Sequence, residues 1–223
     1  VLIKEVIDNA IDEFRMGFGK TIEVDVQNGK VRVRDFGRGI PLNAMKDAVS
    51  RLNTGAKYDS ETFVMSVGMN GVGTKAVNAL SWKFTVQAIR ENKTRRIDFK
   101  QGQMTADTGI VDSTEKQGTI VEFEPDNTKF ENYAFRNEYI TPLLRNYCYL
   151  NPGLAIIFNG EKFQSKNGLL DLLNDKLTSE TLYDPIHIKG NNIEIVLTHT
   201  DQNNDEYYSF VNGQHTTHGG THQ

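Results

Sequence analysis

The chain has 223 residues, of which 38% are hydrophobic and 24% are charged, a composition typical of a globular protein with one large domain or two small ones. Its formal net charge of −4 lacks the basic excess of a surface that neutralises phosphates, so this chain alone is not expected to grip DNA. A single cysteine, Cys148, cannot form an internal disulfide and predicts a cytoplasmic protein, and no apolar run reaches the ~18 residues of a membrane-spanning helix.

The first half of the chain alternates predicted helices with strands. Residues 1–15 repeat apolar side chains at three- and four-residue spacings and predict a helix; no capping residue precedes it, so we expect a further N-terminal segment. Residues 21–26 and 31–35 alternate on either side of Asn28-Gly29, the preferred two-residue turn, and predict a β-hairpin. The pattern then predicts a helix over 42–52, a loop over 54–70 and a helix over 74–80.

The second half is richer in strands. Strands are predicted over 83–90, 94–101, 119–125 and 154–159, with helical segments over 130–150 and 169–177 and a second hairpin formed by 193–200 and 206–211. Hairpins mixed with helices predict an α+β fold, in which a mostly antiparallel sheet is covered by helices.

The first helix has a polar face that admits two interpretations. Glu5 and Asn9 are four residues apart and share one face, and Asp12 lies close by, roughly opposite the apolar stripe. Such a face is ordinarily solvated. Alternatively, the carboxylate takes a proton from water while a hard oxygen ligand holds Mg²⁺.

Asp35 stands where an apolar residue is expected. Val31 and Val33 share one face of their strand, and the period of two places Asp35 on that face as well. A buried carboxylate must find hydrogen-bond donors, so Asp35 either turns out to cap the bend at Gly37 or accepts a bond from an amine on a ligand, such as adenine. In the second case, Gly37 and Gly39 let backbone approach a flat ring closely.

The segment Gly68–Gly73 places three glycines before a predicted helix, which suits a phosphate cradle as well as an ordinary flexible connection. The separation of Gly68 and Gly73 matches a P-loop, but Thr74 precedes Lys75, whereas a P-loop requires the lysine first. A P-loop enzyme is therefore disfavoured.

Three segments together resemble a known superfamily. Residues 5–13, 35–41 and 68–73 look like the N, G1 and G2 boxes of the GHKL ATPases, which include gyrase-type topoisomerases, Hsp90, MutL and histidine kinases. Residues 53–59, 76–81, 117–119 and 219–222 are further similar to B subunits of type IIA DNA topoisomerases, topoisomerase IV before gyrase. The resemblance implies a two-layer α/β sandwich of the Bergerat type, with helices on one face of the sheet.

The resemblance also implies roles for individual residues. Glu5 would be the general base that activates water, Asn9 would ligate Mg²⁺, and Asp35 would accept from the adenine amine, partly through water shared with Gly39 and Thr119. Ile40 and Pro41 would line the adenine pocket, and Arg38 would cover its rim. Lys57, in a mobile loop, would approach the nucleotide. The lid over the phosphates would be formed by Gly68, Met69, Asn70, Gly71, Val72 and Gly73.

The chain departs from the family pattern at two positions. Val1 stands where the family commonly has a histidine that orients the catalytic glutamate, and Asn70 stands where gyrases usually have histidine. We expect residues 1–218 to form the ATPase domain and residues 219–223 to begin the transducer domain, which would supply the lysine that meets the γ-phosphate. His215, His218 and His222 are spaced like metal ligands, but their Gly/Thr-rich segment has no carboxylate or cysteine and disfavours zinc.

The implied function is an ATP- and Mg²⁺-dependent module of a type IIA topoisomerase. In the complete enzyme, ATP binding would close a homodimer of B subunits, which work with an A-type cleavage subunit and meet DNA through the full-length protein. The alternatives are a gyrase B subunit, another GHKL ATPase such as MutL or Hsp90, and a nucleotide-binding module that does not turn over ATP by itself.

Overall fold

The computed structural model describes residues 2–50, 72–131 and 133–216. The chain divides into two compact units: the first comprises Val1–Asn137 and Ile156–Lys162, and the second comprises Glu138–Ala155 and Phe163–Gln223. Within the described ranges, none of the helices has the length and apolar character needed to cross a membrane.

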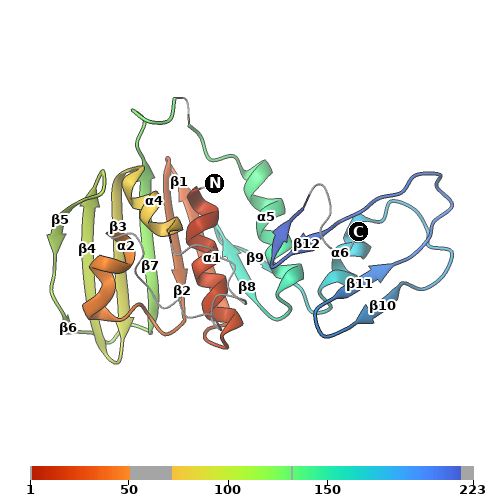
Figure 1. Ribbon diagram of the computed structural model, residues 1–223, viewed down its shortest axis with the longest axis horizontal. Coiled ribbons are helices and arrows are strands. Elements are labelled where there is room, and N and C mark those ends of the chain that lie inside the picture. Colours follow the sequence, from red (N-terminus) through yellow and green to blue (C-terminus); the bar gives the residue numbers. More distant parts are fainter. Residues whose placement is uncertain (1, 51–71, 132, 217–223) are drawn as a thin grey trace. The chain divides into compact units, whose positions relative to one another are not determined.

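A large sheet is the centre of the first unit (Figure 1). Its strands run in the order β5-β4-β3-β7-β2-β1-β8-β9, and β6 pairs with β4 at one edge. The pairings from β5 to β1 are all antiparallel, as the sequence predicts. The strand bounds are β1 (Thr21–Gln27), β2 (Lys30–Asp35), β3 (Ser81–Arg90), β4 (Lys93–Lys100), β5 (Gln103–Asp107), β6 (Val111–Asp112), β7 (Gly118–Pro125), β8 (Ala155–Phe158) and β9 (Glu161–Gln164).

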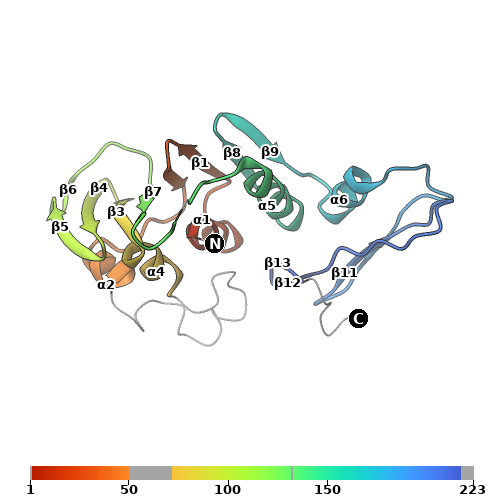
Figure 2. The ribbon, with the colours of Figure 1, turned by 90° about the horizontal axis from the view of Figure 1, so that it is seen from above.

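Helices cover one face of this sheet. Figure 2 shows α1 (Leu2–Arg15), α2 (Met45–Ser50) and α4 (Gly73–Ala79) on the same side, and a short 3₁₀ turn, η1 (Leu42–Ala44), leads into α2. Ile7 and Ile11 of α1 are fully buried, as are Val24, Val86 and Ile97 of the strands. The predicted two-layer α+β architecture is confirmed, because apolar side chains of both layers form one core.

The first hairpin has the predicted turn and register. Asn28 and Gly29 have φ values of +51° and +78°, as a two-residue hairpin turn requires, and Gln27 pairs with Lys30. The buried positions of β2 are Val31, Val33 and Asp35, so the period of two does place Asp35 on the core face.

Several predicted elements need correction. The helix α5 (Asn137–Leu150) begins at residue 137 rather than 130, because Phe130, Tyr133 and Phe135 form a cluster of ring contacts in a non-helical segment. The short strands β5, β6 and β9 were not predicted, because none of them shows a clear alternation of apolar residues.

The predicted hairpin of the second unit was paired wrongly. After α6 (Leu169–Lys176), the strand β11 (Glu194–Leu197) pairs with β10 (Ile186–Lys189), not with residues 206–211. The backbone N–H of Gly190 donates to the carbonyl of Ile193 and closes a tight turn between these two strands. Residues Phe210–Val211 form β12 instead, which pairs with β13 (Gln214–His215).

Candidate nucleotide site

One face of α1 carries a line of polar side chains. Glu5, Asn9 and Glu13 follow one another at four-residue spacing and are all half-buried. Asp12, which the sequence placed with Glu5 and Asn9, is only 4% exposed and lies on the buried side of the helix. The polar line therefore ends in Glu13 rather than in Asp12.

The N-terminal half of this line lies against the start of α4. A Cβ added to Gly73 would come within 2.0 Å of the Glu5 Oε2 atom, so the Gly73 backbone lies directly beside this carboxylate. The Asn9 side-chain nitrogen donates to the Thr74 hydroxyl at 2.6 Å and to the Glu5 carbonyl at 2.9 Å. The structure thus brings Glu5, Asn9 and Gly73 together, although Asn9 and its partner Thr74 are 65 positions apart in the sequence.

Asp35 is buried at the end of β2, with 9% of its surface exposed. Its Oδ1 atom accepts the backbone N–H of Gly37 at 2.9 Å and that of Thr119 at 3.2 Å. Thr119 is the second residue of β7, the strand that pairs with β2, and is as buried as Asp35. The two strands therefore hold the carboxylate in one orientation, with its second oxygen as a further acceptor.

Burial raises the pKa of Asp35 to about 6. The hydrogen bonds from Gly37 and Thr119 favour the charged form and oppose this shift, whereas the negative charge of Glu13 adds to it. A carboxyl group with a strongly raised pKa on a binding surface is a candidate functional group.

Glycine is required at two positions around Asp35. Gly39 has a φ of +73°, and a Cβ there would lie 2.5 Å from the carbonyl oxygen of Ile89. Gly118 has a φ of +146°, and a Cβ there would lie 2.1 Å from the carbonyl oxygen of Asp35. Both glycines let backbone segments meet at close range, which brings the residues after β2 against the start of β7.

Arg38 is bound by a residue that the sequence analysis missed. Its Nε and Nη2 atoms donate to the two carboxylate oxygens of Glu13 at 3.1 and 2.9 Å, and its backbone N–H donates to Glu13 Oε2 at 2.9 Å. The guanidinium also lies over the Phe18 ring, 4.6 Å from its centroid. The spacing of Glu13 from Asn9 and Glu5 was the available signal, since all three lie on one helix face.

The remaining predicted positions are placed as follows. Ile40 is half-buried and Pro41 is exposed, both directly after Gly39, and Val72 precedes the first residue of α4. Lys57, Gly68, Met69, Asn70 and Gly71 lie outside the described residues, as do His218 and His222.

A comparison with protein families decides which fold family this site belongs to. Residues 1–129 match the family described as histidine kinase-, DNA gyrase B-, and HSP90-like ATPases. The chain belongs to this ATPase family. The match contains Glu5, Asn9, Asp35 and Thr119, so the site described above lies within the ATPase domain.

Curated relatives and solved structures refine the assignment. The chain is 46% identical over its whole length to the B subunit of DNA topoisomerase 4 from Borreliella burgdorferi and 33% identical to the B subunit of DNA gyrase from Campylobacter jejuni, of which it covers 37% and 31%. Its structure is similar to the 43K ATPase domain of Thermus thermophilus gyrase B in complex with an aminocoumarin, with a TM-score of 0.82 and 31% identity over 99% of this chain and 62% of that one. The topoisomerase IV ATP-binding domain of Francisella tularensis, in complex with a small-molecule inhibitor, gives a TM-score of 0.79 at 26% identity, with 99% and 64% coverage. The chain thus spans about a third of the length of these curated relatives.

The donor set of the ATPase domain fits a hard divalent cation. Asn9 turns its amide nitrogen toward Thr74, so its amide oxygen is the atom able to ligate a metal, and the Glu5 carboxylate lies one helical turn away. Mg²⁺ accepts few protein oxygens and completes its shell with water and phosphate. Within residues 2–50, 72–131 and 133–216, no group of three or more His, Cys, Asp or Glu side chains is placed to hold a metal by itself.

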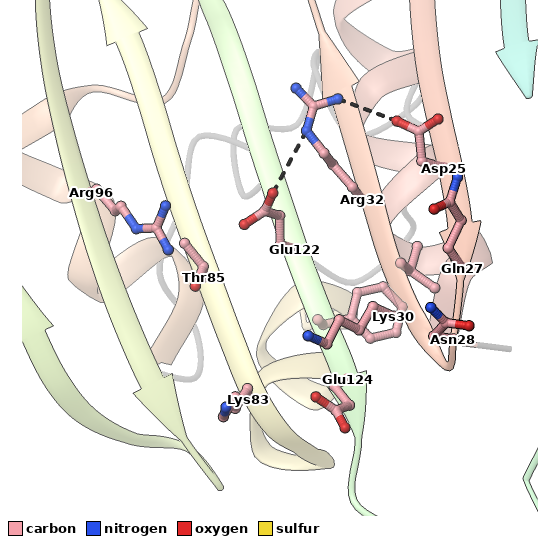
Figure 3. A pocket seen from close by; sticks show the side chains of 12 residues that line it. Asp25, Gln27, Asn28, Lys30, Arg32, Lys83, Thr85, Arg96, Glu122 and Glu124 are labelled. Carbon is pink, nitrogen blue, oxygen red and sulfur yellow. Dashed lines mark hydrogen bonds and ion pairs between the residues drawn. The ribbon is translucent and has the colours of Figure 1, made fainter. Parts of the chain in front are cut away.

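A separate hollow of about 780 Å³ lies on the sheet face opposite the helices (Figure 3). Its lining is polar and of mixed charge, and Arg32 in this lining makes ion pairs with Asp25 and Glu122. Lys83, Arg96 and other strand residues complete it. Because positive and negative side chains alternate here, we interpret this hollow as part of the solvated outer face of the sheet. None of its lining residues belongs to the nucleotide site.

Proposed function

We propose that this chain is the ATP-binding and ATP-hydrolysing module of a type IIA DNA topoisomerase B subunit, similar to topoisomerase IV. One observation carries the proposal: an ATPase-family domain holds two polar groups at different places along α1. Glu5 and Asn9 lie beside the start of α4, whereas the buried carboxylate of Asp35 lies in the segment whose Arg38 binds Glu13. The higher identity to the topoisomerase IV relative than to the gyrase relative, 46% against 33%, favours topoisomerase IV.

Adenine recognition is assigned to the Asp35 end of the site. The ionised carboxylate accepts from the exocyclic amine of adenine, and Thr119 and Gly37 hold it in place. Gly39 lets the backbone approach the ring, and Ile40 with Pro41 provides apolar surface for it. Arg38, bound to Glu13, forms the rim.

Phosphate chemistry is assigned to the other end of α1. The residues from Gly68 to Gly73 would offer backbone N–H groups to the phosphates, and Lys57 would approach them. Asn9 would ligate Mg²⁺, which neutralises phosphate charge when bound. Glu5 orients the attacking water and takes its proton, since a carboxylate at this place needs only to position and deprotonate the nucleophile.

The separation of Glu5 and Glu13 along α1 supports the assignment of adenine and phosphates to different parts of the helix. Glu5 and Glu13 are eight residues apart, which corresponds to roughly 12 Å of helix at about 1.5 Å per residue. A nucleoside triphosphate has to span a separation of this order between its base and its terminal phosphate. A single rigid helix therefore sets the spacing between base recognition and hydrolysis.

In the complete protein, the same chemistry would drive DNA transport. ATP binding would close a homodimer of B subunits around a DNA segment and hydrolysis would reset it, with an A-type subunit cleaving the DNA. Support for this larger assignment comes from the similarity to the B subunits of topoisomerase IV and gyrase, since the chain spans only part of those proteins.

The test of the proposal separates binding from hydrolysis. Glu5→Gln should keep the affinity for ATP and reduce phosphate release at least a hundredfold, because general-base catalysis contributes roughly 10²- to 10⁴-fold. Calorimetry measures the affinity, and a phosphate-release assay on a polypeptide extended to the length of the relatives measures turnover. Weak ATP binding with intact turnover of the bound nucleotide would contradict the role of Glu5, and no binding of ATP by the unmodified chain would contradict the proposed function itself.

A further inference from the structure

Two arginines of the β3–β4 hairpin hold the segment that follows Asp35. The Arg90 Nη1 atom donates to the carbonyl of Gly39 at 3.3 Å, and the Arg95 Nη1 atom donates to the carbonyl of Leu42 at 2.7 Å. Ile40 and Pro41 lie between these two carbonyls. The apolar wall proposed for adenine is therefore attached to the sheet at each end by a charged donor.

Arg95 makes the shorter of the two bonds and is itself fixed. Its Nε and Nη2 atoms donate to the two carboxylate oxygens of Asp107 at 3.1 and 2.7 Å, and Asp107 Oδ1 also accepts the backbone N–H of Gly109 at 2.9 Å. The side chains of Arg95 and Asp107 are only 17% and 24% exposed. Chiefly because of the bonds from Arg95, the pKa of Asp107 is lowered to about 2, so the pair is ionised throughout the neutral range.

The geometry leaves the guanidinium of Arg95 little freedom. A planar guanidinium bound at two nitrogens to one carboxylate has its remaining N–H groups aimed in fixed directions. Here one of them meets the carbonyl of Leu42, the first residue of η1. A lysine at this position would carry the charge but could not serve Asp107 and Leu42 in this fork geometry.

The neighbouring arginine has a different environment. Arg96 follows Arg95 on β4 and therefore points to the opposite face of the sheet, where its Nε atom donates to Asp98 at 3.1 Å and its side chain borders the outer hollow (Figure 3). Both arginines lie on β4 and each binds an aspartate, Asp107 for Arg95 and Asp98 for Arg96, but only Arg95 contacts the segment after Asp35.

We propose that Arg95, held by Asp107, is a positioning residue that fixes Ile40 and Pro41 for adenine and thereby contributes to base specificity. The inference rests on the proposed function, and it assigns to a pair outside the three sequence boxes a role in nucleotide selection. Without the Leu42 bond, the segment becomes ordered only when the nucleotide binds, so affinity decreases. The register between the Asp35 carboxylate and the ring also loosens, so a nucleotide without the adenine amine is rejected less strongly.

The experiment compares ADP with GDP on the chain as it exists, by calorimetry. Arg95→Gln should weaken ADP binding about tenfold, as expected when a carbonyl loses a charged donor, and should lower the ratio of ADP to GDP affinity. Arg95→Lys should give an intermediate value, because the charge remains without the fork. Arg96→Gln, the matched control, should keep the affinity for ADP within about twofold and keep the ratio unchanged.

The outcomes distinguish this inference from the proposed function. If Arg95→Gln and Arg95→Lys both bind ADP with the same affinity as the unmodified chain, and with the same ratio of ADP to GDP affinity, the positioning role is overturned. The proposed function is then left intact. An equal loss of affinity for both nucleotides, accompanied by a lower melting temperature, shows a purely structural role and also overturns it. If the unmodified chain binds no ADP, the proposed function fails, and this inference fails with it. Should Arg95→Gln not fold, Arg95→Lys and Asp107→Asn supply the same comparison.

Discussion

Asp35 is a carboxylate that the fold keeps in a costly place. Its Oδ1 atom accepts two backbone N–H groups, yet burial still raises its pKa from 3.8 to about 6. A shift of this size corresponds to roughly 3 kcal/mol of unfavourable free energy for holding the charged form in the native state. The domain accepts this cost at the residue that we assign to adenine, which is the expected pattern for a binding group rather than a structural one.

Asp35→Asn separates the two consequences. The amide oxygen can still accept from Gly37 and Thr119, but the amide nitrogen then presents a donor to the adenine amine. We expect ADP affinity to decrease roughly 10- to 100-fold, the effect of losing a hydrogen bond to a charged group, while the free energy of unfolding at pH 7 stays equal or increases by about 1 to 3 kcal/mol. Calorimetry and urea unfolding check these values; unchanged affinity would remove Asp35 from adenine recognition.

The same carboxyl group predicts a pH dependence. The charged form is the acceptor, so ADP affinity should decrease as the pH is lowered through about 6. Because the native pKa is raised, the native state holds this proton more tightly than the unfolded chain. The contribution of Asp35 to stability is therefore most favourable below about pH 4 and declines as the pH rises through about 6.

Binding curves between pH 5 and 8 provide the measurement. The Asp35→Asn protein is the control, because it experiences the same titration of the ADP phosphates without the titration of the carboxyl group. An identical pH profile for both proteins would contradict the prediction.

At the scale of elements, α1 is the part of the site that the sequence predicts best. Its spacing places Glu5 and Asn9 on one face, and the alternation of β2 places Asp35 in the core, because both periods are local properties of the chain. The contact between Glu13 and Arg38 was missed, since it joins residues 25 positions apart and depends on how α1 crosses the sheet. Similarly, the bond from Arg95 to Leu42 depends on tertiary packing alone.

The same limit explains the errors in the strands. The hairpin at Asn28-Gly29 was predicted with its register, because the turn residues fix the pairing. The strand β11 has turn-forming residues on both sides, Gly190-Asn191-Asn192 before it and Asn203-Asn204-Asp205 after it, so the sequence allowed either partner; in the structure β11 pairs with β10, and the bond between Gly190 and Ile193 closes the turn. The α+β class survived these errors because the large sheet and its covering helices depend on the longer, more periodic segments.

The junction of α1 and α4 gives a prediction about glycine. Gly73 lies in an ordinary helical conformation, so alanine suits its backbone, but the added Cβ would come within 2.0 Å of the Glu5 carboxylate. We expect Gly73→Ala to displace this carboxylate and reduce turnover about a hundredfold, as misplacement by about 1 Å can, while the free energy of unfolding changes by less than about 1 kcal/mol.

Two measurements test this prediction: phosphate release for turnover and urea unfolding for stability. The double variant Glu5→Ala with Gly73→Ala serves as the control, because it lacks the carboxylate that the new Cβ would meet. We expect it to bind ADP with the same affinity as Glu5→Ala alone. Turnover of Gly73→Ala within about threefold of the unmodified protein would show that the Glu5 carboxylate does not need its present position.

At the scale of the whole molecule, the described site residues all lie in one of the two compact units. Each described site residue, from Glu5 to Thr119, belongs to the first unit, and the family match ends at residue 129. The second unit, with α5, α6 and two small hairpins, contributes none of the described site residues. Nucleotide binding should therefore be a property of this chain by itself.

The dependence of turnover on chain length is the last prediction. The chain as it stands should bind ADP and ATP but release phosphate slowly, because the resemblance to type IIA topoisomerases implies a γ-phosphate lysine from the transducer domain and closure by dimerisation. A polypeptide extended to the length of its relatives should release phosphate at least tenfold faster, because a positioned cation stabilises the developing charge on the transferred group. Its rate per protomer should increase with protein concentration, since two copies must meet. Phosphate release measured over a hundredfold range of concentration checks both statements. Equal rates for the two lengths, without concentration dependence, would mean that Glu5, Asn9 and Asp35 suffice for hydrolysis within one copy of this chain.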